Sequence, residues 1–327
     1  MLALLATPAG AATPLSYLTA AGPKAARVLS LTWGLLAISI AVVVIVTVLV
    51  VAGVLARRTR GVATADVPVE RGGDGLRWIW IGLAASAIPL LVALVWTISV
   101  LAAVNAPRGP MELTIEVTAQ RWWWKARYLN SDASRVFTTA NEIHIPTGQP
   151  VQFKLIGADV IHSFWVPALG GKTDMIPGQS NVTWLQAKRP GRYLGQCGEF
   201  CGAQHAHMGF LIVAETPAAF ELWEDQQIKP APEPATTEIA HGEALFEYRC
   251  GACHTVRGSG AGGSVAPDLT HLMSRTTLAA ATLPHNIGTL SGWIADPQAI
   301  KPGALMPVLD VTGPELQSLR TYLATLR

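Results

Sequence analysis

The 327-residue sequence has few charged residues, and long stretches of it have none. Charged residues make up 14% of the chain and hydrophobic residues 50%, which is too apolar for an ordinary soluble protein. No charge occurs between Arg27 and Arg57, or between Arg77 and Arg108. Each stretch is longer than the roughly 20 apolar residues that span a bilayer as a helix. The sequence therefore predicts a transmembrane helical hairpin within residues 28–107.

Because neither helix contains an ionisable residue, this chain offers no proton relay within the bilayer. The short loop between the helices is basic, and the positive-inside rule places it in the cytoplasm. Its basic residues are Arg57, Arg58, Arg60, Arg71 and Arg77. Everything after Arg108 is therefore expected outside. The N-terminal segment, residues 1–27, begins with small residues suited to signal-peptide cleavage but lacks an initial basic region, so the sequence leaves its removal open.

The chain has only four cysteines, and they form two pairs with different surroundings. In the first pair, Cys197 and Cys201 are followed by His205 and Met208. Thiolate and imidazole suit copper or zinc, and the thioether favours copper. A structural zinc site would need a second cysteine pair nearby, and a disulfide would leave the histidine and methionine without a role. His162, expected at the end of a strand, can supply the missing ligand.

This pattern resembles the dinuclear copper A site of subunit II of haem-copper cytochrome c oxidases. The implied ligands are the bridging Cys197 and Cys201, the terminal His162 and His205, the axial Met208 and the backbone carbonyl of Glu199. Two coppers that share two thiolates spread one electron over both metals, so little rearranges when the charge changes. The resemblance also implies that the Glu199 carboxylate helps to hold a magnesium ion shared with subunit I.

Apolar and polar residues alternate from Met111 onward, which predicts a half-buried strand over residues 111–118. Further short strands are expected, separated by turn signals rich in proline and glycine. They are expected at Glu142–Ile145, Val151–Leu155, Asn181–Ala187, Tyr193–Gln196 and Met208–Ala214. Short strands at this spacing favour an all-β sandwich. The resemblance implies that residues 108–216 form a cupredoxin sandwich.

Three adjacent tryptophans, Trp122 to Trp124, lie early in this domain. Alternation along a strand sends Trp122 and Trp124 to one face and Trp123 to the other, so at least one is expected to be exposed. An exposed tryptophan on a redox domain can contact an electron donor, whereas core packing or a membrane-interface belt explains two of the three equally well. The family resemblance favours Trp122 as the point of electron entry, with Trp124 and Tyr128 packed beneath it.

The second cysteine pair follows a stretch of alternating prolines, which predicts a semi-rigid linker over residues 217–238. The sequence Cys250-Gly-Ala-Cys-His254 then has the spacing of covalent c-type haem attachment. A zinc site would need a second ligand pair, and a redox Cys-x-x-Cys motif would not need the histidine. The motif implies that Cys250 and Cys253 bind the haem covalently and that His254 ligates its iron.

Residues 239–327 resemble an all-α class I cytochrome c domain. A helix with Gly242 and Phe246 precedes the haem motif, and a closing helix is expected from Thr312, with a capping box to Glu315. Two such terminal helices cross around the haem in this fold.

The sixth iron ligand of this domain is expected to be a sulfur. Met306 lies in a proline-rich loop far enough along the chain to reach the opposite haem face, and it matches the family's methionine-proline motif. Met273 is the alternative. Trp293 is expected to pack against the haem. Ligation by methionine and histidine favours electron transfer over oxygen binding.

The whole chain therefore resembles subunit II of a terminal cytochrome c oxidase fused to a cytochrome c domain. The resemblance implies a component of a respiratory-chain oxidoreductase and translocase. Its electrons would come from a cytochrome c donor or another donor complex and pass through haem c and copper A to subunit I, which reduces oxygen. A short tether would hold the haem near the copper at high effective concentration. Subunit I, other oxidase subunits, the donor and membrane lipid are the expected partners. Balanced charges offer no basic surface for nucleic acid.

We expect a multi-pass protein of the bacterial cytoplasmic membrane with both metal domains on the periplasmic face. Two alternatives stay open from the sequence. One is the electron-input subunit of a copper-A-type nitric oxide reductase, because the same ligands would serve. The other is a membrane-anchored electron shuttle or copper-handling protein without a large companion. The quinol oxidase form of the subunit is disfavoured because it lacks the copper ligands.

Overall fold

The computed structural model describes residues 12–13, 15–59, 75–107 and 109–327. The start of the N-terminal segment and the basic loop over residues 60–74 lie outside the described residues. The chain divides into two compact units. One is Ala26–Ala106, and the other combines Met1–Ala25 with Pro107–Arg327.

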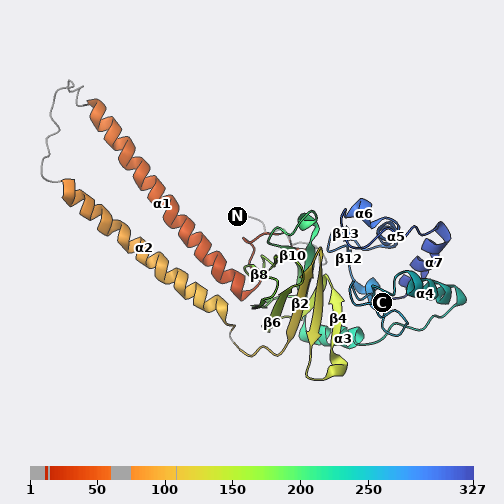
Figure 1. The fold of residues 1–327 in the computed structure, drawn as a ribbon. Helices are drawn as coiled ribbons and strands as arrows, with labels where there is room; N and C mark the ends of the chain where they lie inside the picture. Colours follow the sequence, from red (N-terminus) through yellow and green to blue (C-terminus); the bar gives the residue numbers. More distant parts are fainter. Residues whose placement is uncertain (1–11, 14, 60–74, 108) are drawn as a thin grey trace, which may run out of the picture. The chain divides into compact units, whose positions relative to one another are not determined.

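The smaller unit consists of two long apolar helices, α1 (Pro23–Thr59) and α2 (Gly75–Asn105) (Figure 1). Their apolar side chains face outward, with Leu49 66% exposed and Leu90 68%. The spans Pro23–Ala56 and Gly75–Asn105 are long and apolar enough to cross a membrane. A helix satisfies its own backbone hydrogen bonds, so such an apolar exterior suits lipid. Both predicted helices are present.

The larger unit contains a β-sandwich domain, residues 109–227, built from two sheets (Figure 1). One sheet has the order β5-β11-β10-β7-β8, with β1 beside β10, and the other has the order β4-β3-β2-β6-β9. The strands are β1 (Ala12–Thr13), β2 (Thr114–Gln120), β3 (Trp123–Leu129), β4 (Phe137–Ala140), β5 (Glu142–Pro146), β6 (Val151–Gly157), β7 (His162–Trp165), β8 (Thr173–Met175), β9 (Ser180–Leu185), β10 (Gly191–Cys197) and β11 (Gly209–Glu215). Short 3-10 turns are η1 (Ala133–Arg135) and η2 (His205–His207). The predicted all-β sandwich is confirmed.

Alternating burial along the strands places one face of each sheet in a shared core. Ile115, Val117 and Ala119 of β2 are fully buried. They belong to the same apolar cluster as Phe153 of β6 and Phe164 of β7. A fully buried side chain of this size contributes about 1.5–3 kcal/mol through removal from water. This core gives the loops at the end of the sandwich a rigid base.

Two strand predictions need correction. The strand expected from Met111 begins at Thr114, because its antiparallel partner β3 ends at Leu129, which pairs with Thr114. His162 opens β7 and does not end a strand, because the preceding turn is held by the Asp159 carboxylate, which accepts the backbone N–H of Val160 at 2.7 Å.

The predicted linker over residues 217–238 is shorter in the structure. Its first part forms α3 (Pro217–Gln227), with Thr216 as N-cap. Phe220 joins the sandwich core, and the Trp223 ring stacks on His144 with centroids 4.1 Å apart. Because this helix buries its apolar face on the sandwich, only residues 228–236 connect the two domains.

The C-terminal domain, residues 237–327, is mainly helical. Its elements are α4 (Thr237–Arg249), η3 (Leu272–Ser274), β12 (Thr277–Leu278), β13 (Leu283–Pro284), α5 (Ile287–Ala295), α6 (Pro297–Ile300) and α7 (Gly313–Leu323). Helices α4 and α7 pack closely at Gly242, where an added Cβ would lie 2.4 Å from the Ser318 carbonyl oxygen. The expected capping box between Thr312 and Glu315 is present. Both predicted terminal helices are confirmed.

Candidate metal and haem sites

The first cysteine cluster lies at one end of the sandwich, where three elements converge. Cys197 ends β10, and Met208 directly precedes β11. The two strands are antiparallel neighbours, and the Cys197 N–H donates to the Met208 carbonyl at 3.0 Å, which closes the loop between them. That loop carries Cys201 and, in η2, His205. Strand β7 pairs with β10 and brings His162 alongside.

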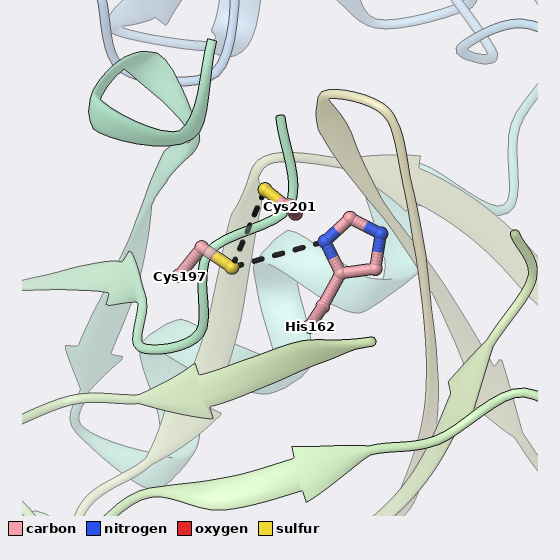
Figure 2. Close-up of side chains that lie close together, drawn as sticks. All are labelled: His162, Cys197 and Cys201. Atoms are coloured by element: carbon pink, nitrogen blue, oxygen red, sulfur yellow. Dashed lines mark hydrogen bonds between the residues drawn. The ribbon is translucent and has the colours of Figure 1, made fainter. Parts of the chain in front are cut away.

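The ligand atoms face one another across this loop. Figure 2 shows His162, Cys197 and Cys201 pointing together, with the Cys197 sulfur 3.7 Å from His162 Nδ1 and 3.8 Å from the Cys201 sulfur. The Cys201 sulfur is 3.6 Å from His205 Nδ1 and 3.8 Å from Met208 Sδ. Both cysteines are free thiols, because a disulfide would hold the sulfurs about 2.05 Å apart. Two sulfurs, each beside one imidazole, form a cluster that can hold a thiophilic metal.

A backbone oxygen completes this set. The Cys197 sulfur is 3.2 Å from the Glu199 carbonyl oxygen. The structure thus brings together all six positions singled out in the sequence. The donor set of two thiols, two imidazoles, a thioether and a carbonyl is soft to borderline, which fits copper.

The thiols share protons in a way that prepares them for metal. A hydrogen bond with Cys201 lowers the pKa of Cys197, despite its burial. The same hydrogen bond, followed by burial, raises the pKa of Cys201. One thiolate therefore forms readily, and a bound cation would displace the remaining proton because metals bind cysteine as thiolate.

Sequence reasoning missed Asp159, which orients the first imidazole. Its Oδ1 lies 2.8 Å from His162 Nε2, leaving Nδ1 directed at the sulfurs. Burial lowers the pKa of His162, but its hydrogen bonds with Cys197 and Asp159 outweigh that effect and raise it. A carboxylate on the outer nitrogen of a ligand histidine fixes its tautomer. The only signal in the sequence is an acidic residue three positions before a ligand histidine.

The tryptophans follow the predicted alternation, but Trp122 is not exposed. Trp122 and Trp124 are 8% and 0% exposed, while Trp123 is half-buried. Trp122 Nε1 donates to the Cys201 carbonyl at 3.1 Å, and Trp124 Nε1 donates to the Met208 carbonyl at 3.4 Å. Trp122 is therefore not a surface residue, and its role as the point of electron entry stays a prediction. Residues of the C-terminal domain cover it, including Gly303.

The second cysteine pair opens onto an apolar cavity of about 300 Å³, which is lined mostly by the C-terminal domain and partly by the β-sandwich domain. Its walls include Cys250, Cys253, His254, Met306 and Trp293. His254 Nδ1 lies 2.8 Å from the Pro267 carbonyl, so its Nε2 is left for a metal. Burial lowers the pKa of His254, which favours the neutral form that binds iron.

Two buried arginine nitrogens support the fit to a haem. Arg249 and Arg275 line the cavity, and the Nε of each is buried without a hydrogen-bond partner. A buried unpaired donor is unfavourable, and the carboxylates of a haem are acceptors of the required charge. Met273 packs in the apolar cluster of this domain and is not among the cavity walls, whereas Met306 is.

The Glu199 carboxylate lies on the surface beside a lysine. Lys172 Nζ forms ion pairs with Glu199 and, at 3.1 Å, with Asp174 of β8. Glu199 is 40% exposed at its side chain, so it is accessible to a neighbouring subunit. A cation held by these acids would have to displace Lys172.

Residues of both domains form one wall of the haem cavity. Trp122, Trp123 and Arg121 of the β-sandwich domain line it together with Lys301 and Met306 of the C-terminal domain. Trp122 therefore contacts the cavity on one side and the Cys201 loop on the other. The two sites are adjacent across one indole ring.

Comparisons with known proteins agree with this division. Residues 115–215 match the family "cytochrome c oxidase subunit II, periplasmic domain", and residues 239–327 match the cytochrome c family. Cytochrome c oxidase subunit 2 of Alkalihalophilus pseudofirmus is 33% identical over 89% of this chain and 85% of its own length. The Bacillus sp. PS3 protein of the same name is 31% identical, covering 83% of this chain and 80% of its own.

A solved structure is also similar. The periplasmic domain of subunit II of cytochrome oxidase from Bradyrhizobium japonicum is 32% identical over 36% of this chain and 95% of its own, with a TM-score of 0.34. The two apolar helices and the periplasmic-domain relatives indicate a membrane-anchored protein with an outer domain. The chain belongs to the cytochrome c oxidase subunit 2 family, in a form that carries a cytochrome c domain at its C-terminus.

Proposed function

We propose that this chain is the electron-input subunit of a haem-copper terminal oxidase, taking electrons from a cytochrome c donor and delivering them to subunit I, where oxygen is reduced. The haem c and the dinuclear copper A would supply the one-electron redox chemistry. The observation that carries the proposal is the position of Trp122, which lines the haem cavity and donates to the carbonyl of Cys201.

The β-sandwich domain would hold the copper pair with little freedom. We assign Cys197 and Cys201 as bridges, His162 and His205 as terminal ligands, and the Met208 sulfur as axial ligand. The Glu199 carbonyl would be the sixth ligand. Support comes from the hydrogen bonds that fix this loop, in which Trp124 and Trp122 bind carbonyls on either side. A rigid ligand loop keeps the geometry similar in both redox states, which favours fast electron transfer.

The C-terminal domain would hold the haem through Cys250 and Cys253, with His254 and Met306 as the axial pair. Its apolar walls exclude water from the iron, and the methionine sulfur favours a relatively high potential. Trp122, buried between the cavity and the copper loop, would receive electrons from this haem and not from a free donor. An external donor would then act on the haem, at a face that the β-sandwich domain does not cover.

The oxidase partner would contact the outer end of the copper loop. Glu199 and Phe200 lie there, and Phe200 is 80% exposed. An exposed aromatic side chain next to a metal loop suits burial against a partner subunit. We assign the Glu199 carboxylate to a magnesium ion shared with subunit I, in a complex where Lys172 has moved away from it.

Metal and haem analysis of the purified membrane complex tests the proposal. We expect two coppers and one covalent haem per chain, oxygen consumption with reduced cytochrome c, and loss of both copper and oxidase activity in Cys197→Ser. The haem spectrum of that variant should be unchanged. Zinc in place of copper, normal activity of Cys197→Ser, or consumption of nitric oxide instead of oxygen would contradict the assignment.

A further inference from the structure

Two buried charged side chains that neither metal site uses join the β-sandwich domain to the C-terminal domain. Glu142, at the start of β5, and Lys301, after α6, are each 2% exposed. Charged residues are rarely buried unless they are paired or fully hydrogen-bonded. Glu142 finds its partners, and Lys301 two of its three, on the other domain, so the contact between the domains accounts for their burial.

Lys301 extends from the C-terminal domain into the base of the copper loop. Its Nζ donates to the carbonyls of Trp122 and His207 at 2.7 Å each, and to that of Ala279 at 3.1 Å. Burial lowers the pKa of Lys301 to about 7. Three carbonyl acceptors match the three N–H groups of the protonated amine. Two of the three acceptors belong to the β-sandwich domain.

Glu142 makes the reciprocal contact from the β-sandwich domain. Its Oε1 accepts the backbone N–H groups of Thr276 and Thr277 at 2.8 and 2.7 Å, and their hydroxyls at 2.8 and 2.9 Å. Arg192 of β10 also donates to the Thr276 hydroxyl. Hydrogen bonds to a charged acceptor are about twice as strong as neutral ones.

The segment between these two contacts is strained. Ala279, Ala280 and Ala281 all have left-handed backbone, with φ of +52°, +61° and +58°. This conformation is unfavourable for a residue with a Cβ, because the Cβ comes too close to the following carbonyl oxygen. The turn is held against the copper loop, where the Gly209 N–H donates to the Ala280 carbonyl at 3.0 Å. Strain of this kind persists only where surrounding contacts fix it.

We propose that the C-terminal domain is docked on the β-sandwich domain in one fixed position, with Lys301 and Glu142 as reciprocal anchors and the backbone of the copper loop as the docking surface. In this arrangement both buried side chains keep their hydrogen-bond partners, and a shifted arrangement that still buried either one would lose them, which favours this register. Gln204 adds a further contact from the loop, donating to the Pro302 carbonyl at 2.9 Å. The linker then only connects the domains and does not keep them together.

Cutting the linker in the intact protein tests this. A protease site replaces residues 232–235 of the full-length holoprotein, of which Pro232, Glu233 and Ala235 are exposed. The protein is then cleaved in detergent and passed over a sizing column. The two halves should co-elute, also at high salt, because buried pairs are weakly screened. Lys301→Met and Glu142→Gln should each raise the released haem fraction by about tenfold, as expected for losing a charged hydrogen-bonding group.

Matched controls are Lys154→Met and Glu112→Gln, which change exposed residues of the β-sandwich domain and should release nothing. Gln204→Leu removes a neutral contact and should release a smaller haem fraction, so the proposal does not depend on the charge variants folding. Separation of the wild-type halves on cleavage would overturn the proposal. The proposal would also be overturned if Lys301→Met, Gln204→Leu and the controls released equal fractions of haem. None of these readouts depends on electron transfer.

Discussion

The two metal-carrying domains differ in what lies beneath their ligands. Under the copper loop the β-sandwich domain has a filled aromatic core, in which Phe210 lies 4.8 Å from Trp124 and 4.7 Å from Phe164 between ring centroids. The C-terminal domain has a cavity of about 300 Å³ at the corresponding place, lined by core residues such as Phe246 and Leu319. The first domain is therefore complete around its ligands before a metal binds. The second depends on the haem to fill its core.

Removing the two thioether bonds to the haem should show this difference most strongly. In the double variant Cys250→Ser, Cys253→Ser no thioether can form. The apolar walls of the cavity, among them Phe246 and Leu319, would then lose the group that they pack against and face water, and a small domain has only about 5–15 kcal/mol of stability to lose. We expect the C-terminal domain to unfold while the β-sandwich domain keeps its copper. Limited proteolysis with copper analysis would measure both.

The comparison predicts the opposite for the copper site. Cys197→Ser should remove the metal, yet the free energy of unfolding of the β-sandwich domain should differ by only about 1 kcal/mol from that of the copper-free wild type, because no core volume is lost. Two results would contradict this comparison. One is unfolding of the β-sandwich domain in Cys197→Ser, and the other is a C-terminal domain that stays protease-resistant without haem.

Local patterns sufficed to predict most of the fold and to single out the residues proposed to hold copper and haem. Five of the six residues proposed to hold copper lie within residues 197–208, and the helix from Thr312 was recognisable because its capping box is local. Contacts between distant residues were not predictable. Lys301 and Trp122 are 179 positions apart, and no pattern in either segment indicates that they meet. The covering of Trp122 and the packing of α3 are consequences of such contacts.

Trp122 is where the two domains meet, so changing it should affect communication more than stability. Trp122→Phe keeps an aromatic ring but leaves the buried Cys201 carbonyl without its donor, a loss of about 1–3 kcal/mol to the loop. We expect the copper site to oxidise the haem roughly tenfold more slowly, which corresponds to about 1.4 kcal/mol added to the barrier for electron transfer. The absorption spectra of both sites should be unchanged. Flash photolysis of the holoprotein would measure the rate, with Trp123→Phe as the matched control. An unchanged rate would mean that the indole N–H plays no part.

The smallest effect should be an acid sensitivity confined to the C-terminal domain. Hydrogen bonds from the Thr312 backbone, from Arg249 and from the Thr312 hydroxyl lower the pKa of Glu315 from 4.5 to about 2. A carboxyl whose pKa falls on folding stabilises the protein above its unfolded pKa, so this contribution is lost as the pH drops from about 4.5 towards 2. Glu315→Gln should lower the haem-domain unfolding temperature by a few degrees near neutral pH and flatten its decline below pH 4.5. Glu221→Gln, on the exposed face of α3, should keep the wild-type profile. If Glu315→Gln and wild type lose stability in parallel between pH 4.5 and about 2, then Glu315 does not cause the acid sensitivity of the C-terminal domain.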